Sequence, residues 1–444
     1  MSPSKGTTPR RKKTTDLQRP SPLDFGNRIA DLCVCTHVMN ARIATLLLGL
    51  ALVTAACTTS QDQDASPPVP ENSTTIPTQS ESPLLLVTDG AGAVVVIEDN
   101  GTVIETIEPP AGTRYSQPIW ASPSTIVYAQ IAPEDNRLEA LRLGGNSVWS
   151  VELDTAPFYY LAAPASDVPT VVSLRNKVDG SGLIIERITA GAPPLTLSED
   201  APFYASWNPS DGRLASHVGD TRLDITGSPT ETIDAIASGF QAPVWLTAGL
   251  VSLRDRGDDT YLTLWDDSSF SDIARVRGAS RFVGSGDSIA IVTGGNIETG
   301  GIQALAQALP TINSGVLTVI DLEESSFTSV TSDPTPMFQW DRAGEQLLYV
   351  TFVNDPTPAL EWHVWEDGEV TDFDPFVPDP SWFATVAPFF DQYAQSVSLW
   401  SPDGSAFAYP ALVDGEARIL VQHLDETGPL DIAPGTWVTW SPSR

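Results

Sequence analysis

From Pro83 onward, short runs of apolar and β-branched residues alternate with turns that are rich in Gly, Pro, Asn and Asp. Clear examples of such runs lie at 84–87, 93–97, 125–128 and 182–185. Short runs bounded by turn residues indicate β-strands, whereas a helix needs apolar residues at helical spacing over a longer stretch. The pattern therefore predicts an all-β fold over residues 83–444.

The strands recur in units that each begin with an aromatic residue, followed by a turn and a second strand. Clear copies begin at Trp120, Trp207, Trp245, Trp340, Trp400 and Trp440, and weaker copies at Tyr160 and Phe282. In chain order these anchors are 40, 47, 38, 37, 58, 60 and 40 residues apart. A repeat near this length with four strands in each unit is typical of a β-propeller, in which the aromatic residue packs between adjacent blades.

The most complete copy reads Trp400-Ser401-Pro402-Asp403-Gly404, and the stretches 207–212 and 440–443 match it in part. These copies resemble the TolB-like propeller repeat, whose hallmark is Trp-Ser-Pro-Asp-Gly before an apolar strand. The resemblance extends over nearly all of 84–444 and implies a propeller. It implies no particular function, because the family ranges from scaffolds to accessory domains of enzymes. The signature of the related Trp-Asp repeat is absent.

The two ends of the repeat region complement each other. The chain ends with 435–442, a first strand that carries the anchor Trp440 and has no strand after it. The strands from Leu84 onward lack an opening aromatic residue, so we expect them to pair with the C-terminal strand and complete the last blade. Seven full repeats and this composite blade predict a single eight-bladed propeller of four-stranded blades. Seven blades are the alternative, because the copies at Tyr160 and Phe282 are the weakest.

The residues before the propeller region contain an export signal. Residues 1–38 are basic and irregular, and from Met39 a short basic start precedes the apolar run 43–53 and small residues before Cys57. This order is that of a signal peptide at 39–56, whose apolar run is too short to span a bilayer. We predict that translation starts at Met39 and that 1–38 is a misassigned extension. A twin-arginine signal on Arg10-Arg11 is the alternative.

Residues 52–57, Leu-Val-Thr-Ala-Ala-Cys, resemble a bacterial lipobox. The family usually has Leu, Val or Ile three residues before the cysteine, where this chain has Thr54. The resemblance implies that Cys57 is lipidated. We therefore expect export and a lipid anchor at the outer face of the cell membrane, or at the outer membrane if the source has two membranes. Residues 57–82 are polar and rich in Ser, Thr, Pro and acidic residues, which predicts a disordered tether.

The charge of the chain excludes some partners. The chain has 24 Lys and Arg against 56 Asp and Glu, a formal net charge of −32, and residues 58–444 alone have 16 against 53. Because phosphates would be repelled, nucleic acid and anionic lipid head groups are excluded as main partners. Of the three cysteines, Cys33 and Cys35 precede the signal peptide, so neither a zinc site nor a disulfide framework is predicted.

The sequence lacks familiar catalytic motifs. After the signal peptide the histidines are His217, His363 and His423, and neither a Gly-x-Ser-x-Gly elbow nor a His-Glu-x-x-His pair occurs. His217 and His363 lie in strand patterns, which favours a structural role. Acidic residues cluster at 255–259, 266–272 and 372–379 without the ordered spacing of a calcium loop, so solvated turns are favoured over calcium sites. No metal and no cofactor are predicted.

Two anchor spacings exceed the repeat and mark insertions. The first, near 294–315, has apolar residues at helical spacing over 302–309, which predicts a short helix with either a packing or a partner-binding role. The second, 374–398, predicts a short helix at 387–395 and is dense in aromatic residues. These aromatic residues either plug one end of the ring, which is the favoured interpretation, or line a binding site. The candidate ligand- or partner-binding residues are Trp382, Phe383, Phe389, Phe390 and Tyr393.

The favoured functional hypothesis is a non-enzymatic, lipid-anchored, extracytoplasmic propeller that binds a protein or cell-envelope ligand at one rim or at the mouth of the ring. Its partner would be an envelope or periplasmic protein or a glycan. The alternative is a hydrolase or lyase that acts on polysaccharide through Asp or Glu at the centre of the ring, for which two carboxylates about 5–10 Å apart would be the evidence. A third hypothesis is a purely structural spacer.

Overall fold

The computed structural model describes residues 83–133, 135–164, 168–219, 222–227, 231–233, 241–294, 311–312, 315–353 and 358–442. The predicted extension 1–38, the signal peptide, Cys57, the tether and the expected helix at 302–309 lie outside these residues. Within them, no helix is both long and apolar enough to cross a membrane.

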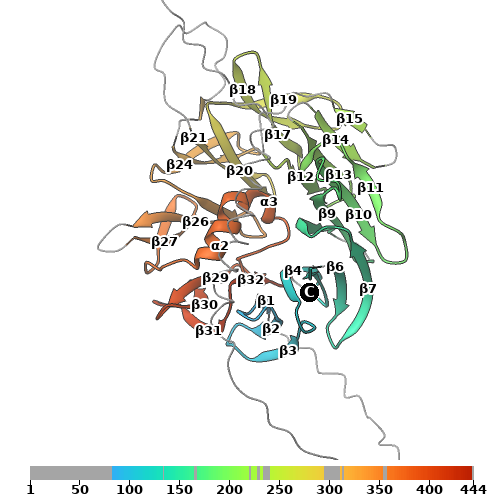
Figure 1. The fold of residues 1–444 in the computed structure, drawn as a ribbon. Helices are drawn as coiled ribbons and strands as arrows, with labels where there is room; N and C mark the ends of the chain where they lie inside the picture. The colour runs from blue at the N-terminus through green and yellow to red at the C-terminus, as the bar shows by residue number, and fades with distance from the viewer. Residues whose placement is uncertain are drawn as a thin grey trace, which may run out of the picture. The chain divides into compact units, whose positions relative to one another are not determined.

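The described chain folds into eight β-sheets, which are the blades of a β-propeller (Figure 1). Blade 1 contains β32 (Trp437–Trp440), β1 (Leu84–Thr88), β2 (Val94–Glu98) and β3 (Val103–Ile107). Blade 2 contains β4 (Arg114–Ser122), β5 (Thr125–Ile131), β6 (Asn136–Arg142) and β7 (Asn146–Leu153). Blade 3 contains β8 (Pro157–Ala162), β9 (Thr170–Asn176), β10 (Leu183–Thr189) and β11 (Leu195–Ser198). Blade 4 contains β12 (Pro202–Trp207), β13 (Leu214–Val218), β14 (Arg222–Thr226) and β15 (Glu231–Ile233).

The second half of the ring departs from this pattern in two blades. Blade 5 contains β16 (Val244–Leu246), β17 (Gly249–Arg256), β18 (Asp259–Trp265) and β19 (Phe270–Val276), and β22 (Thr311–Ile312) adds a fifth, parallel strand. Blade 6 contains β20 (Ala279–Ser285), β21 (Ser288–Gly294), β23 (Leu317–Asp321) and β24 (Ser326–Thr331). Blade 7 contains β25 (Met337–Trp340), β26 (Gln346–Val353), β27 (Ala359–Glu366) and β28 (Glu369–Asp372). Blade 8 contains β29 (Ala406–Val413), β30 (Glu416–His423) and β31 (Leu430–Pro434), and a bridge between Trp400 and Phe407 stands in place of its first strand.

The predicted closure of the ring is confirmed. Strand β1 pairs antiparallel with β32, so that Leu85 lies opposite Trp440 and Val87 opposite Val438. The alternative of seven blades is wrong, because the weak copies at Tyr160 and Phe282 each open a sheet of their own, on β8 and β20.

The first strand of each blade lines the centre of the ring. These inner strands contact one another from blade to blade, as β32 does with β4, β4 with β8, β12 with β16, and β16 with β20. All eight predicted anchors lie on the inner strands or at the Trp400 bridge, and none is more than 7% exposed. Aromatic burial between blades therefore holds the ring together, as the repeat predicts.

A recurring hydrogen bond joins neighbouring blades. The anchor indole N–H donates to a backbone carbonyl of the preceding blade: Trp120 to Thr439 at 3.4 Å, Trp207 to Leu161 at 3.3 Å, Trp245 to Ser206 at 3.2 Å and Trp400 to Gln339 at 3.1 Å. Each acceptor is the residue next to the anchor of that preceding blade. The indole therefore both fills the space between two blades and satisfies an inner-strand carbonyl.

Candidate functional site at the centre of the ring

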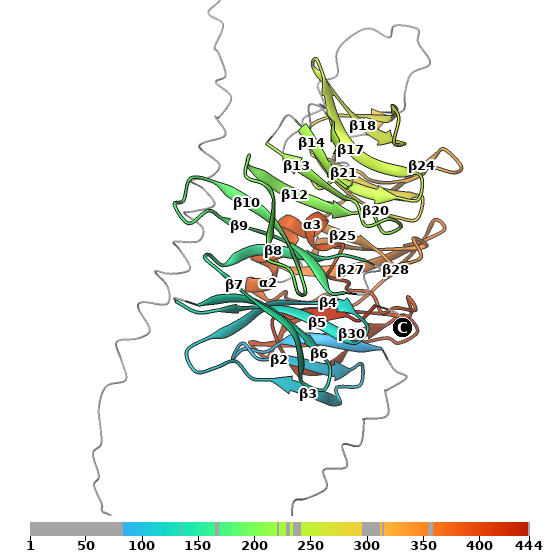
Figure 2. The same ribbon diagram turned by 90° about the vertical axis from the view of Figure 1, so that its right-hand side faces the viewer.

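The second insertion enters the ring between blades 7 and 8. Isolated bridges join Phe376 to Leu360 of β27 and Pro378 to Ala411 of β29. Asp379 then begins α2 (Pro380–Thr385) as its N-cap, because its Oδ1 accepts the backbone N–H of Trp382 at 2.9 Å. A 3-10 turn, η1 (Ala387–Phe389), and α3 (Phe390–Tyr393) follow. Figures 1 and 2 both place α2 and α3 among the inner strands, and residues 380–398 are called the central plug below.

Two glutamines attach the central plug to blade 4. The Gln392 amide accepts the N–H of Ala205 at 3.1 Å and donates to the carbonyl of the same residue at 3.2 Å. The Gln395 amide accepts the N–H of Trp207 at 3.1 Å and also donates to the carbonyl of Ala205 at 3.1 Å. An amide side chain offers the same donor and acceptor as a peptide group. The two side chains therefore complete the inner edge of β12 as a neighbouring strand would.

Side chains and backbone of the plug also bind other inner strands. Ser396 accepts the N–H of Ala162 on β8 at 3.1 Å, and the Tyr393 hydroxyl accepts from the Gln117 amide on β4 at 3.1 Å. The Gln339 amide on β25 donates to the carbonyl of Val397 at 2.7 Å and accepts the N–H of Leu399 at 2.8 Å.

Two further contacts reach blades 6 and 1. Arg281 on β20 donates to the carbonyl of Ala387 at 3.2 Å, and the N–H of Ser398 donates to the Thr439 hydroxyl on β32 at 3.0 Å. One segment thus binds the inner strands of six blades and continues into blade 8. These contacts are those of a plug, the favoured one of the two interpretations of the insertion.

The five predicted aromatic candidates divide into two groups. Trp382, Phe390 and Tyr393 are buried and belong to the hydrophobic core. Phe383 and Phe389 are only partly buried. The ring of Phe383 lies edge-on to that of Phe352, with centroids 6.4 Å apart, and Phe352 is 50% exposed. Phe383 and Phe389 thus reach the surface in part, whereas Phe390 and Tyr393 pack against Phe338 of β25 and Trp437 of β32.

The most deeply perturbed carboxyl group of the described residues is Asp391 of α3, which is 3% exposed. Burial raises its pKa to about 6, against the lowering influence of the nearby Arg281 charge and of backbone N–H groups, among them those of Gln392 and Ala242. Its Oδ1 has no hydrogen-bond partner among the described residues.

Sequence reasoning missed Asp391, Arg281 and the glutamines of the centre. The sequence gives one indication of three of them. Asp391, Gln392 and Gln395 are polar residues within the aromatic segment and lie outside any predicted turn, which suggests that they form specific contacts. The strands that they bind are far away along the chain, so their partners could not be named from the sequence.

The predicted acidic clusters take part in ordinary local contacts. Asp259 and Asp272 pair with Arg275 and Arg256. Asp379 caps α2 as described, and among the described residues no group of three or more His, Cys, Asp or Glu side chains is placed to hold a metal ion.

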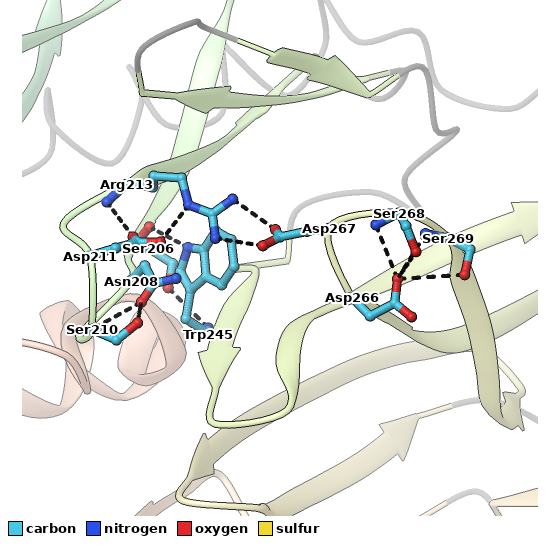
Figure 3. Close-up of polar contacts among 10 residues, drawn as sticks. All are labelled: Ser206, Asn208, Ser210, Asp211, Arg213, Trp245, Asp266, Asp267, Ser268 and Ser269. Atoms are coloured by element: carbon cyan, nitrogen blue, oxygen red, sulfur yellow. Dashed lines mark hydrogen bonds and ion pairs between the residues drawn. The ribbon is translucent and has the colours of Figure 1, made fainter.

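The cluster 266–272 also contributes to a contact between blades 4 and 5, which Figure 3 shows. Arg213, after the turn between β12 and β13, makes two hydrogen bonds to Asp267 at 2.7 and 3.1 Å. Its guanidinium lies 4.9 Å from the ring centroid of Trp245. Beside it, Asp266 accepts hydrogen bonds from Ser268 and Ser269, which hold the pKa of Asp266 below its usual range.

One histidine belongs to a hydrogen-bonded series that sequence reasoning did not foresee. Nε2 of His363 lies 2.8 Å from the Thr351 hydroxyl, and its Nδ1 lies 2.7 Å from Asp372. Hydroxyl, imidazole and carboxylate in this order can activate a nucleophile. Here the hydroxyl is buried within blade 7 and the imidazole stacks on Tyr349, so the series links three strands of one blade.

A cavity of about 370 Å³ lies on the outer part of blades 7 and 8. It is lined by Val364, Glu366, Asp367, Glu369, Thr371 and Leu424. Its three carboxylates would repel an anion.

No family model and no curated protein matches the chain. Solved structures resemble it in fold. A crystal structure of the eukaryotic initiation factor is 7% identical with a TM-score of 0.48, over 82% of this chain and 100% of that one. The β-propeller domain of the Trilobed protease from Pyrococcus furiosus is 12% identical with a TM-score of 0.40, over 73% and 86%. Oligogalacturonate lyase from Vibrio parahaemolyticus is 9% identical with a TM-score of 0.42, over 73% and 87%. At such identities the likeness concerns the fold alone.

Proposed function

We propose that the chain is an exported, lipid-anchored β-propeller that binds an envelope protein or glycan without catalysing a reaction. One observation carries the proposal: the chain's own residues 380–398 fill the centre of the ring and leave Phe383, beside the exposed Phe352, at its surface. Because the plug is hydrogen-bonded to the inner strands, it forms a rigid surface at the opening of the ring and leaves little room for a substrate inside.

Charge narrows the chemistry of the partner. Residues 343–417, which include the central plug and most of blades 7 and 8, contain 13 Asp and Glu and no Lys or Arg. A partner that approaches the mouth from this side meets an acidic field, so a basic surface with an apolar anchor fits it best. Among envelope ligands, we therefore favour a basic protein segment over an acidic glycan.

The geometry gives less support to the alternative of a polysaccharide hydrolase or lyase. Glycoside hydrolysis uses a pair of carboxylates on either side of the bond that is broken. Among the described residues, the central plug contains Asp391, and the charge that acts on it is that of Arg281 rather than that of a second acid. We therefore keep binding as the proposed function.

A site-specific crosslinking experiment tests the proposal. A photoreactive amino acid replaces Phe383 in the full-length protein, and the matched control replaces Val178, an exposed apolar residue in the turn between β9 and β10 of blade 3. We expect a discrete adduct with one basic protein from position 383 that weakens as salt is added. No adduct, or the same adducts from both positions, would contradict partner binding at the mouth.

The lipid anchor has its own test. Cells that express the protein are fed a clickable fatty acid, and the label on the protein is compared with that on a Cys57→Ala variant. We expect label on the first and none on the second. Equal label on both proteins would show that Cys57 is not the site of lipidation.

A further inference from the structure

The carboxyl group of Asp391 lies where the central plug is bound to the ring. Its neighbours in sequence, Gln392 and Tyr393, make the contacts to blades 4 and 2 described above. Asp391 is almost completely buried, and its Oδ1 has neither a hydrogen-bond partner nor solvent contact within the described part of the chain. A buried carboxylate oxygen without a partner is costly, whereas a protonated carboxyl group carries no charge to bury.

The groups that face Asp391 do not neutralise it through a direct ion pair. Arg281 of β20 acts on it through its charge, but within the described residues its hydrogen bond goes to the carbonyl of Ala387. The other titratable groups around it are the phenols of Tyr159 on β8 and Tyr204 on β12, and the pKa of each is raised by burial and by the charge of Asp391. Tyr393 on α3 is likewise buried, and all three phenols are neutral at ordinary pH.

We propose that protonation of Asp391 locks the central plug into the ring and that its ionisation loosens it, so that the binding surface at the mouth is firmest in acid. This proposal rests on the proposed function, because it concerns the regulation of the same site. The loosening is local: α3 and the residues up to Ser398 would separate from β12 and β20 while the blades stay intact.

The direction of the pH dependence follows from the shift of this carboxyl group. A carboxyl group whose pKa is raised in the closed state binds its proton more tightly there than in an open state with the ordinary value. The extra stability of the closed plug is therefore complete below about pH 4 and is lost as the pH rises through about 6. A difference of this size changes the ratio of open to closed plug on the order of a hundredfold overall, and about tenfold between pH 5 and 7.

Hydrogen exchange on the full-length protein measures this ratio without any partner. The reporting amides are those of Ala394 and Val397, whose N–H groups donate to Phe390 and Tyr393 inside the plug. After correction for the intrinsic effect of pH, we expect their protection to fall about tenfold between pH 5 and 7. Amides of the β26–β27 ladder, which are bonded within blade 7, should keep their protection.

Three variants separate the proposed cause from a general effect of pH. Asp391→Asn cannot ionise, so its plug amides should keep their protection from pH 5 to 7. Asp374→Asn removes an exposed carboxylate of the same insertion and should leave the wild-type pH dependence unchanged. Arg281→Gln removes the charge that lowers the pKa of Asp391, so the fall in protection should move to higher pH even if the variant is less stable.

The proposal is overturned if protection of the plug amides is the same at pH 5 and 7, if it falls equally in Asp391→Asn, or if the β26–β27 amides change with them. None of these results depends on a partner. If position 383 gives no crosslink but the protection of the plug amides still depends on pH, the proposed function is refuted and the role of Asp391 stands. If position 383 gives the crosslink but the protection does not depend on pH, the role of Asp391 is refuted and the proposed function stands.

Discussion

The inner edge of a propeller strand carries backbone N–H and C=O groups that need partners, and amide side chains supply them in this protein. Gln392 binds both groups of Ala205, and Gln339 does the same for Val397 and Leu399 from the opposite direction. Glutamine suits this role because it can satisfy a peptide group without adding a charge to the centre. The centre is thereby closed by side chains that act in place of a further strand.

Replacing Gln392 by Ala should lower the free energy of unfolding by about 2 kcal/mol, because the buried N–H of Ala205 loses its side-chain partner and the C=O keeps only Gln395. The matched control is Gln395→Ala, whose side chain is exposed and can be replaced by water, so its cost should be less than about 1 kcal/mol. Urea unfolding measures both. Equal costs would mean that burial of the Gln392 side chain adds nothing to the contribution of its two hydrogen bonds.

A comparison of two anchors measures how much the indole hydrogen bond contributes to the free energy of unfolding. Trp245 and Trp340 are equally buried, and each lies edge-on to a second Trp at 6.2 Å, but only Trp245 has a partner for its indole N–H among the described residues. Trp245→Phe should therefore cost about 1 kcal/mol more than Trp340→Phe in the free energy of unfolding. Calorimetry or urea unfolding decides this, and the reverse order would show that the hydrogen bond does not contribute.

Single side chains were the hardest feature to predict from the sequence. The aromatic density of 374–398 marked the segment, yet nothing in the sequence separates the buried Phe390 from the partly exposed Phe389 beside it. The side to which a residue points depends on how α2 and α3 are placed by bridges to β27 and β29. Those contacts join distant parts of the chain, which local patterns do not encode.

Between blades, one surface contact combines charge with aromatic packing. Arg213 covers Trp245 and binds Asp267 across the gap between blades 4 and 5 (Figure 3). The side chain of Asp267 is 59% exposed and that of Arg213 27%, so water and salt screen the ion pair more than they affect the packing.

Arg213→Ala should thus lower the free energy of unfolding by about 1–2 kcal/mol, because Trp245 loses its cover. Asp267→Asn should cost less than about 1 kcal/mol, and this smaller loss should disappear in high salt. Denaturant unfolding at two salt concentrations compares them. A larger loss for Asp267→Asn would mean that the ion pair, rather than the stacking, joins the two blades.

Elements were predicted well wherever a strand repeats and less well in the insertions. The periodic anchors located every inner strand, because each blade reuses one pattern of apolar strand and glycine turn; Gly212 and Gly404 adopt positive φ of 70° and 71° in the two best copies. The single helix expected at 387–395 is instead η1 followed by the short α3. Pro388 near the start of that segment favours a tight turn, and the contacts of the whole central plug to six blades then fix its path.

The entire ring is closed by one hairpin-like pairing. The N–H of Leu84 donates to the Ser441 hydroxyl at 3.2 Å although 357 residues separate them, and the N–H of Ser441 donates to the carbonyl of Leu84 at 2.7 Å. The sequence predicted this closure because the last repeat has a first strand alone. The number of blades followed from the same argument.

A circular permutant tests the closure. A linker of about four residues joins Ser441 to Pro83, as in a β-hairpin, and the chain is opened in the exposed connection at Pro110–Ala111, between blades 1 and 2. We expect a folded ring with a single cooperative unfolding transition, because every blade would then be continuous in sequence. A control opened inside β9 should not fold, and a permutant as disordered as that control would refute the closure.

The closing strand β32 also decides whether blade 1 has a paired inner edge. Strands β1 to β3 are made first, and their blade keeps an open inner edge until β32 has been synthesised. A chain that lacks β32 would present that unpaired edge to chaperones and proteases instead of a finished ring. Truncations that remove β32 should therefore be as damaging as those that remove whole blades.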